Sequence, residues 1–182
     1  MTTTLRSTIT AQLGWTWRDS AGQVVIVDSN RLQFKKDLAD GTGSNQADAV
    51  WHVEDQSLAT GVSTTLELDA LEKSLFDDTI YVSFLKIKAI VIVNKNTSGE
   101  GHLLVGGAAT DPWQAPFGDA AHAVKVMSGG ALLVAHPRDG WDVEPGSRDL
   151  KITAVGQRAT FDVAVLGTIT DAGSSSSSSS GV

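Results

Sequence analysis

The stretch FLKIKAIVIVNKN, which runs from Phe84 to Asn96, determines how the rest of this chain is interpreted. It is an apolar run that two lysines interrupt. Side chains alternate between the two faces of a strand, so a period of two sorts the stretch into two sets. The first set is apolar throughout and is predicted to face a core: Leu85, Ile87, Ala89, Val91 and Val93. The second set changes from lysine to isoleucine along its length: Phe84, Lys86, Lys88, Ile90, Ile92 and Asn94.

The mixed second face predicts a strand that is solvated at one end and covered at the other. Lys86 and Lys88 are expected to be solvated charges that protect the sheet, rather than a catalytic pair. Ile90 and Ile92 are expected to lie under a cover, either another part of the chain such as the N-terminal hairpin or a neighbouring subunit. Their burial would contribute about 1.5–3 kcal/mol each. This strand therefore favours a protein that associates with other chains.

Upstream of this stretch the sequence predicts a β-hairpin. Apolar and polar residues alternate strictly in ITAQLGWTW (9–17), Asp19–Gly22 has the composition of a turn, and QVVIVDS follows as a second strand. Residues 9–28 are therefore predicted to form a hairpin with one apolar face. The next segment, 31–50, fits either a short helix or a strand.

From Val50 onward the sequence predicts one strand after another. At most one short helix is expected, at LEKSLFDD (71–78), and Gly156–Arg158 is expected to be a tight hairpin turn. Roughly eight to ten short strands at this spacing are typical of an all-β fold, a β-sandwich or barrel. We expect three parts: an N-terminal arm or hairpin (1–40) that could serve for attachment, a β-sandwich domain (41–170) and a disordered Ser-rich tail (171–182).

Composition excludes several classes of function. The 182 residues carry a net charge of −7, which argues against a general nucleic-acid binder because such a protein needs a basic face. With no cysteine, the chain has no disulfide, thiolate zinc site or cysteine nucleophile. No stretch has the length and apolar character of a signal peptide or a membrane span. These features predict a protein made in a cytoplasm, without a membrane partner.

Motifs that carry chemistry are not found in the sequence. The histidines lack metal-ligand spacing: His52, His102, His122 and His136. The densest acidic loop holds Asp139, Asp142 and Glu144, but their spacing does not match a calcium-binding EF-hand loop. No nucleophile elbow or phosphate-binding loop occurs. The sequence therefore nominates no catalytic residue, no cofactor and no metal ligand.

Tryptophan is unusually frequent, with five residues against one tyrosine. Trp15 and Trp17 lie in the predicted hairpin and are expected in a core or an interface. Trp113 and Trp141 lie in loops, where an aromatic residue either caps the end of a core or anchors a partner. The candidates for an interface are therefore Trp15, Trp17, Ile90, Ile92, Trp113 and Trp141.

Four segments of the chain resemble a family of small structural proteins of tailed bacteriophages. They are GTGSNQADAVWH (Gly41–His52), LKIKAIVIVNKNTSGEGHLLVGGA (Leu85–Ala108), VKVMSGGALLVAHPRDGWDV (Val124–Val143) and ATFDVAVLG (Ala159–Gly167). The resemblance implies a β-sandwich of jelly-roll type that assembles on the virion. It implies no enzyme activity and transfers no catalytic residue.

Together these expectations favour a homo-oligomeric head decoration, cement or spike protein of a virion, made in the host bacterial cytoplasm. One apolar patch would bind sister copies, and the N-terminal hairpin would attach to the major capsid protein or to another virion protein. An acidic charge suits a coat component that must not bind packaged DNA. The alternative is a tail or tail-fibre component that binds a receptor or glycan through Trp113 and Trp141. A third hypothesis, a cell-wall or polysaccharide hydrolase, would involve Asp139, Asp142 and Glu144.

Overall fold

The computed structural model describes residues 4–21, 24–75, 78–108 and 110–169. Within these ranges the chain is all-β, as predicted, with thirteen strands and no helix. The strands are β1 (Ser7–Ala21), β2 (Val24–Leu38), β3 (Ala49–Leu58), β4 (Ser63–Glu67), β5 (Leu71–Leu75), β6 (Asp78–Val82), β7 (Phe84–Asn94), β8 (His102–Gly106), β9 (Ala123–Met127), β10 (Ala131–Ala135), β11 (Trp141–Asp142), β12 (Asp149–Val155) and β13 (Ala159–Ile169). The predicted tail, 171–182, lies outside the described residues.

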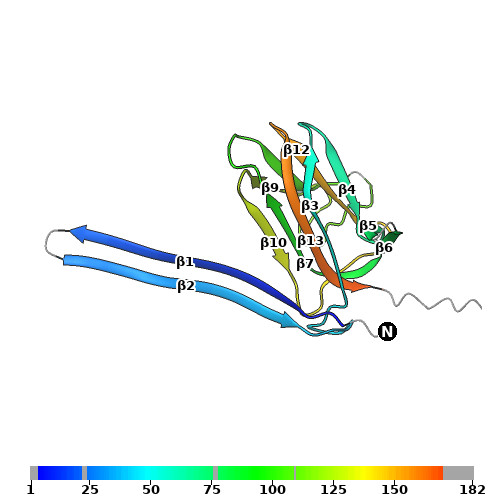
Figure 1. The fold of residues 1–182 in the computed structure, drawn as a ribbon, viewed down its shortest axis with the longest axis horizontal. Helices are drawn as coiled ribbons and strands as arrows, with labels where there is room; N and C mark the ends of the chain where they lie inside the picture. The colour runs from blue at the N-terminus through cyan, green and yellow to red at the C-terminus, as the bar shows by residue number, and fades with distance from the viewer. Residues whose placement is uncertain (1–3, 22–23, 76–77, 109, 170–182) are drawn as a thin grey trace, which may run out of the picture.

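A long antiparallel hairpin, formed by β1 and β2, projects far beyond the other sheets (Figure 1). We call it the arm. The hairpin prediction is confirmed, but its predicted length and turn were wrong. Pairing continues without interruption from Ser7 opposite Leu38 to Ala21 opposite Val24, so β1 runs through most of the expected turn. Of the ambiguous segment 31–50, residues 31–38 form the second half of β2, and residues 49–50 begin β3.

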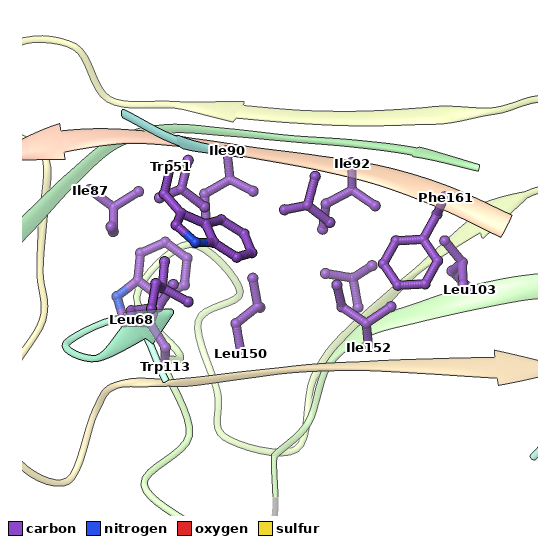
Figure 2. Packing of buried hydrophobic residues seen from close by; sticks show 14 of the residues in the cluster. Trp51, Leu68, Ile87, Ile90, Ile92, Leu103, Trp113, Leu150, Ile152 and Phe161 are labelled. Carbon is purple, nitrogen blue, oxygen red and sulfur yellow. The ribbon is translucent and has the colours of Figure 1, made fainter. Parts of the chain in front are cut away.

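Two larger antiparallel sheets enclose the core. The first has the strand order β10-β7-β13-β3, with β11 beside β7, and the second has the order β4-β12-β8-β9. Their facing side chains form one apolar cluster in which Ile90, Ile92 and Phe161 of the first sheet meet Leu150 and Ile152 of the second (Figure 2). A further two-stranded sheet, β5-β6, occupies the position where a short helix was predicted, so that prediction was wrong.

The predicted hairpin turn at Gly156–Arg158 was also wrong. This segment joins β12 to β13, which lie in different sheets. Gly156 has a positive φ of 82°, so the local turn chemistry was recognised correctly. A tight turn, however, does not determine whether the next strand pairs with the previous one or crosses to the facing sheet.

The face assignment of β7 needs the largest correction. Its ladder with β13 shifts register twice, and the partners step from Ala89 to Ile87 and from Lys86 to Phe84. Each shift leaves one extra residue in β7 and reverses the alternation of side chains beyond it. Ile90 and Ile92, predicted to lie outside, are 1% and 0% exposed in the core.

Phe84, predicted to lie outside, also joins the core, and Leu85, predicted to lie inside, is exposed. Ile87 lies in the core as predicted. Ala89, Val91 and Val93, which were predicted to be inside, lie on the outer face of the sheet. A glycine is needed opposite the irregularity, because a Cβ atom at Gly167 would lie only 2.1 Å from the carbonyl oxygen of Lys86.

Because Ile92 points into the core and Val93 points outward, truncating each of them should lower the free energy of unfolding by different amounts. Ile92→Ala should lower the free energy of unfolding by about 2–5 kcal/mol, because it leaves a cavity in a closed core. Val93→Ala, on the outer face, should lower it by less than about 1 kcal/mol. Urea denaturation of the two variants measures the difference. A larger loss for Val93→Ala would contradict the observed register.

Candidate interaction surface

The arm has one apolar and one polar face, because directly paired residues of its two strands point to the same side. The first face carries the apolar residues Ile9, Ala11, Leu13, Trp15, Trp17, Ile26, Leu32, Phe34 and Leu38, with Ser7, Asp19, Asp28, Asn30 and Lys36 between them. The opposite face carries Thr8, Thr10, Gln12, Thr16, Arg18, Ser29, Arg31, Gln33, Lys35 and Asp37, with Val25 and Val27 near the tip. We call the first set the apolar arm face.

Most of the apolar arm face is open to solvent. Leu13 and Leu32 are cross-strand partners and are 66% and 71% exposed. Trp15 and Trp17 are exposed as well, and the indole Nε1 of Trp15 donates a hydrogen bond of 3.0 Å to Asp28. An isolated two-stranded hairpin is at best marginally stable, so a hairpin with this much open apolar surface is suited to being covered.

The base of the arm is the part that the chain covers itself. Ile9 and Leu38 are buried in a small cluster with Ala47 and Ala89. Partly buried residues pack around this cluster: Leu5, Leu133, Ala135 and Leu166. The base of the arm therefore rests on the outer face of the β10-β7-β13-β3 sheet.

This outer sheet face is itself apolar. Paired residues form rows across the four strands, and the row at the base of the arm contains Ala135, Ala89, Leu166 and Val50. The next row contains Leu133, Val91, Ala164 and His52. An antiparallel sheet with one face on the core usually has a polar second face, but these two rows hold a single polar side chain. We call them the outer sheet face.

The apolar arm face and the outer sheet face are continuous. A hollow of about 380 Å³ lies where they meet, and its lining is mostly apolar. Its walls are Ser7, Thr8, Ile9 and Thr10 of β1 with Val50, Ala89, Val91, Leu133, Ala164, Val165 and Leu166 of the sheet. One surface, built from two separate elements, is therefore available to a partner.

Of the predicted interface residues, the structure places two on this surface. Trp15 and Trp17 lie on the apolar arm face, whereas Ile90 and Ile92 lie in the core. Leu32 and Phe34 of β2 and the residues of the outer sheet face were not among the predicted interface residues. Alternation of Leu32 with Phe34 was the available signal, and it was too short to decide between helix and strand.

The loop tryptophans belong to the body of the protein. Trp113 is 2% exposed, and its ring contacts those of Phe117 and Trp141 edge-on, with centroids 6.4 and 6.0 Å apart. Its Nε1 donates a 3.0 Å hydrogen bond to the carbonyl oxygen of Asp142. Trp141 is half-buried and lies 5.4 Å from the ring of His136. Trp113 thus caps the core, which leaves it no surface for a partner.

The two lysines of β7 differ in environment. Lys86 is partly exposed and forms an ion pair with Asp142. Lys88 is 1% exposed, so the prediction that it is solvated was wrong. Its ammonium donates to the carbonyl oxygens of Arg138 (2.9 Å) and Gly43 (3.3 Å). Burial lowers the pKa of Lys88, and nearby Asp139 opposes that shift.

Lys88 therefore has a structural role. It lies in the register irregularity of β7 and holds two loops together, and the hydroxyl of Ser44 donates to Asp139 across the same junction (2.9 Å). These hydrogen bonds hold in place the loop that joins the arm to β3. Buried charges of this kind are retained where their hydrogen bonds are satisfied.

The acidic loop does not gather into a metal site. Asp139 accepts from Ser44, Asp142 pairs with Lys86, and Glu144 is exposed. Among the described residues no group of three or more His, Asp or Glu side chains could hold a metal ion. The described ranges also contain no helix that could cross a membrane.

A second hollow, of about 560 Å³, opens between the edges of the two sheets, beside β3 and β4. Trp51, Phe161 and Val163 form its floor, and Glu67 and Glu72 lie at its rim. The indole of Trp51 donates to the carbonyl oxygen of Glu72 (2.8 Å), so its polar atom is already satisfied. The polar residues of its lining include Glu67, Glu72 and Tyr81.

A scan against models of protein families found no match to this chain, and a search of curated proteins found no similar sequence. The interpretation of the surface therefore depends on its own geometry and on the resemblance described above.

A charged cluster at the start of β12 provides a test of the local electrostatics. Arg148 binds Asp69 (2.9 Å) and lies 3.4 Å from Asp111. Burial raises the pKa of Asp149, repulsion from Glu67 adds to the shift, and Arg148 opposes it. The Oδ1 atom of Asp149 is buried without a hydrogen-bond partner among the described residues. At neutral pH this carboxylate therefore costs folding free energy.

We expect Asp149→Asn to raise the melting temperature at pH 7. The folded state binds the Asp149 proton more tightly than the unfolded state, so the cost of ionisation disappears as pH falls through the raised pKa toward 3.8. The advantage of the variant should therefore shrink at acid pH. Thermal melts followed by circular dichroism from pH 7 to pH 3 measure it, with Glu100→Gln, in an exposed loop, as control. An advantage independent of pH would contradict this account.

Proposed function

We propose that this chain is a non-enzymatic structural protein of a bacteriophage particle, which acts by self-assembly on the capsid surface as a decoration, cement or spike protein. The observation that carries the proposal is the continuous apolar surface formed by the arm and the outer sheet face. Its exposed side chains are mostly apolar, which suits association rather than bond chemistry.

We further propose that the body is a β-sandwich of jelly-roll type. The order of pairing supports this. If the arm, the β5-β6 hairpin and the two-residue β11 are set aside, eight strands remain in the body, of which the first pairs with the last (β3 with β13) and the second with the seventh (β4 with β12). The third pairs with the sixth (β7 with β10) and the fourth with the fifth (β8 with β9). Such nested pairing is the wrapping of a jelly roll, an architecture found in viral capsid domains.

The bacteriophage setting comes from the resemblance of four segments to virion structural proteins. Three of these segments supply strands β7, β10 and β13, which build the outer sheet face, and the fourth enters β3. The net charge of −7 is consistent with a coat component that is soluble and does not bind packaged DNA. A receptor- or glycan-binding role through loop tryptophans gains no support from a buried Trp113.

Self-assembly through the apolar arm face predicts a specific loss. The double variant Leu13→Asp with Leu32→Asp should weaken self-association at least tenfold, because it places two carboxylates on a surface that becomes buried. The matched control is Gln12→Asp with Gln33→Asp. That pair also sets two carboxylates opposite each other, but on the polar face, and it should change association little. Light scattering and sedimentation velocity measure both variants. If the unsubstituted chain remains a 19.1 kDa monomer at micromolar concentration, that result would contradict the proposed self-assembly.

Location on the particle gives a separate prediction. An antibody against this chain should label the surface of purified heads, at many positions on each particle. Electron microscopy of immunogold-labelled particles measures it. Label confined to the tail tip would replace the decoration role with a tail or tail-fibre role, and unlabelled particles would remove the virion assignment.

A further inference from the structure

We propose that the partner of this surface is a second copy of the chain, with the apolar arm face of one copy lying on the outer sheet face of the other. The inference rests on the proposed function, since it names the partner for self-assembly. Two apolar surfaces of the same molecule are left open, and each has the chemistry that would cover the other.

The contact between arm and sheet already exists within one copy. At the base of the arm, Ile9 and Leu38 are buried against Ala89, with Leu166 packed beside them. These residues belong to the same two faces that remain open further along. The apolar face of the hairpin therefore already packs on this apolar sheet face within one copy. The parts of each face that remain open can form the same kind of contact with another copy.

The geometry favours another copy over the chain's own sheet for the rest of the arm. The hairpin projects away from the two sheets (Figure 1). Leu13, Leu32 and Trp17 lie further along the hairpin than its buried base, and they are exposed. At about 3.4 Å per residue, each fifteen-residue strand of the arm extends about 50 Å.

The areas indicate a closed, reciprocal assembly. A two-stranded ribbon about 50 Å long and about 10 Å wide presents roughly 500 Å² on one face. Because the base of this face is already buried in its own copy, one arm can bury at most about 1,000 Å² in total with a partner, below the 1,200–2,000 Å² of a stable interface. Two copies that exchange arms can bury at most about 2,000 Å², which brings the contact into that range. We therefore expect each copy both to give and to receive an arm.

Besides Asp19 and Lys36 of the arm, this contact encloses two carboxylates that already have partners. Asp28 on the apolar arm face accepts the indole hydrogen bond of Trp15. Asp162, at the far side of the outer sheet face, lies 3.4 Å from the ammonium of Lys95. Both carboxylates therefore keep a partner when the surfaces close, which limits the desolvation penalty.

Crosslinking between two singly substituted chains tests the arrangement, and the absence of native cysteine makes each new thiol unique. Leu13→Cys chains are mixed with His52→Cys chains and treated with a short bismaleimide. Both positions are exposed, so folding should be retained, and circular dichroism checks it. We expect a crosslinked dimer whose peptides join residue 13 to residue 52, identified by mass spectrometry.

The matched control is Gln12→Cys, which neighbours Leu13 but points from the polar face. Its crosslink to His52→Cys should be at least tenfold weaker. Equal yields from the two arm positions, or crosslinks only between two residues at position 13, would overturn arm-on-sheet docking. If light scattering still shows an oligomer in that case, the proposed self-assembly survives. A monomer in light scattering would remove both.

Lipid and other virion proteins are the competing occupants, because Val25, Ile26 and Val27 near the tip of the arm are exposed. Incubation with vesicles of anionic phospholipid, followed by flotation, tests the first. Flotation of the unsubstituted chain without any crosslink from residue 13 to residue 52 would assign the arm to a membrane. A crosslink from residue 13 to the major capsid protein in whole particles, with none to a second copy, would assign it to the shell.

Discussion

Strand β7 is apolar on both of its faces, and this constraint shapes the rest of the molecule. Ile90 and Ile92 point into the core, while Ala89, Val91 and Val93 point outward from the same strand. A strand of this kind has to be covered on both sides. The second sheet covers the inner side. The base of the arm covers one end of the outer side, and the remaining rows are the surface on which the proposed function rests.

The continuous aliphatic run from Ala89 to Val93 makes β7 apolar on both faces, and the register irregularity decides which residues face the core. With one extra residue at Lys88 and another at Leu85, both Ile87 and Ile90 point inward. The Lys88 ammonium binds the loops around Gly43 and Arg138. The loop around Gly43 leads from the arm to β3, so these hydrogen bonds also help to hold the end of the arm in place.

The sequence was sufficient where a pattern was local and uninterrupted. Strict alternation from Ile9 to Trp17 predicted both the hairpin and its apolar face, because every second residue of a strand must lie on one side. The same rule failed for β7, since a register shift reverses faces and leaves no mark in the alternation itself. The prediction at Gly156 failed for a different reason. The turn was recognised, but contacts distant in sequence determine which sheet β13 joins.

Loop tryptophans show why site prediction was harder than fold prediction. A tryptophan between turn-forming residues suits a binding anchor and a core cap equally well, and Trp113 is the cap because its indole finds a carbonyl acceptor inside the fold. Leu32 and Phe34 were missed for the opposite reason. Their alternation is too short to indicate a face alone, and it becomes visible only when pairing with Leu13 and Ala11 places them beside it.

Continuity between the arm and the sheet has a consequence for assembly. The two open faces meet at Ile9 and Leu38, so a partner that covers one face reaches the edge of the other. Covering both in one event buries a single continuous patch, which has a shorter solvent-exposed rim than two separate contacts of the same total area. The opposite face of the arm carries Arg18, Arg31 and Lys35, which stay hydrated when the apolar face is covered. Because an isolated two-stranded hairpin is at best marginally stable, a partner that covers the apolar face would also stabilise the arm itself.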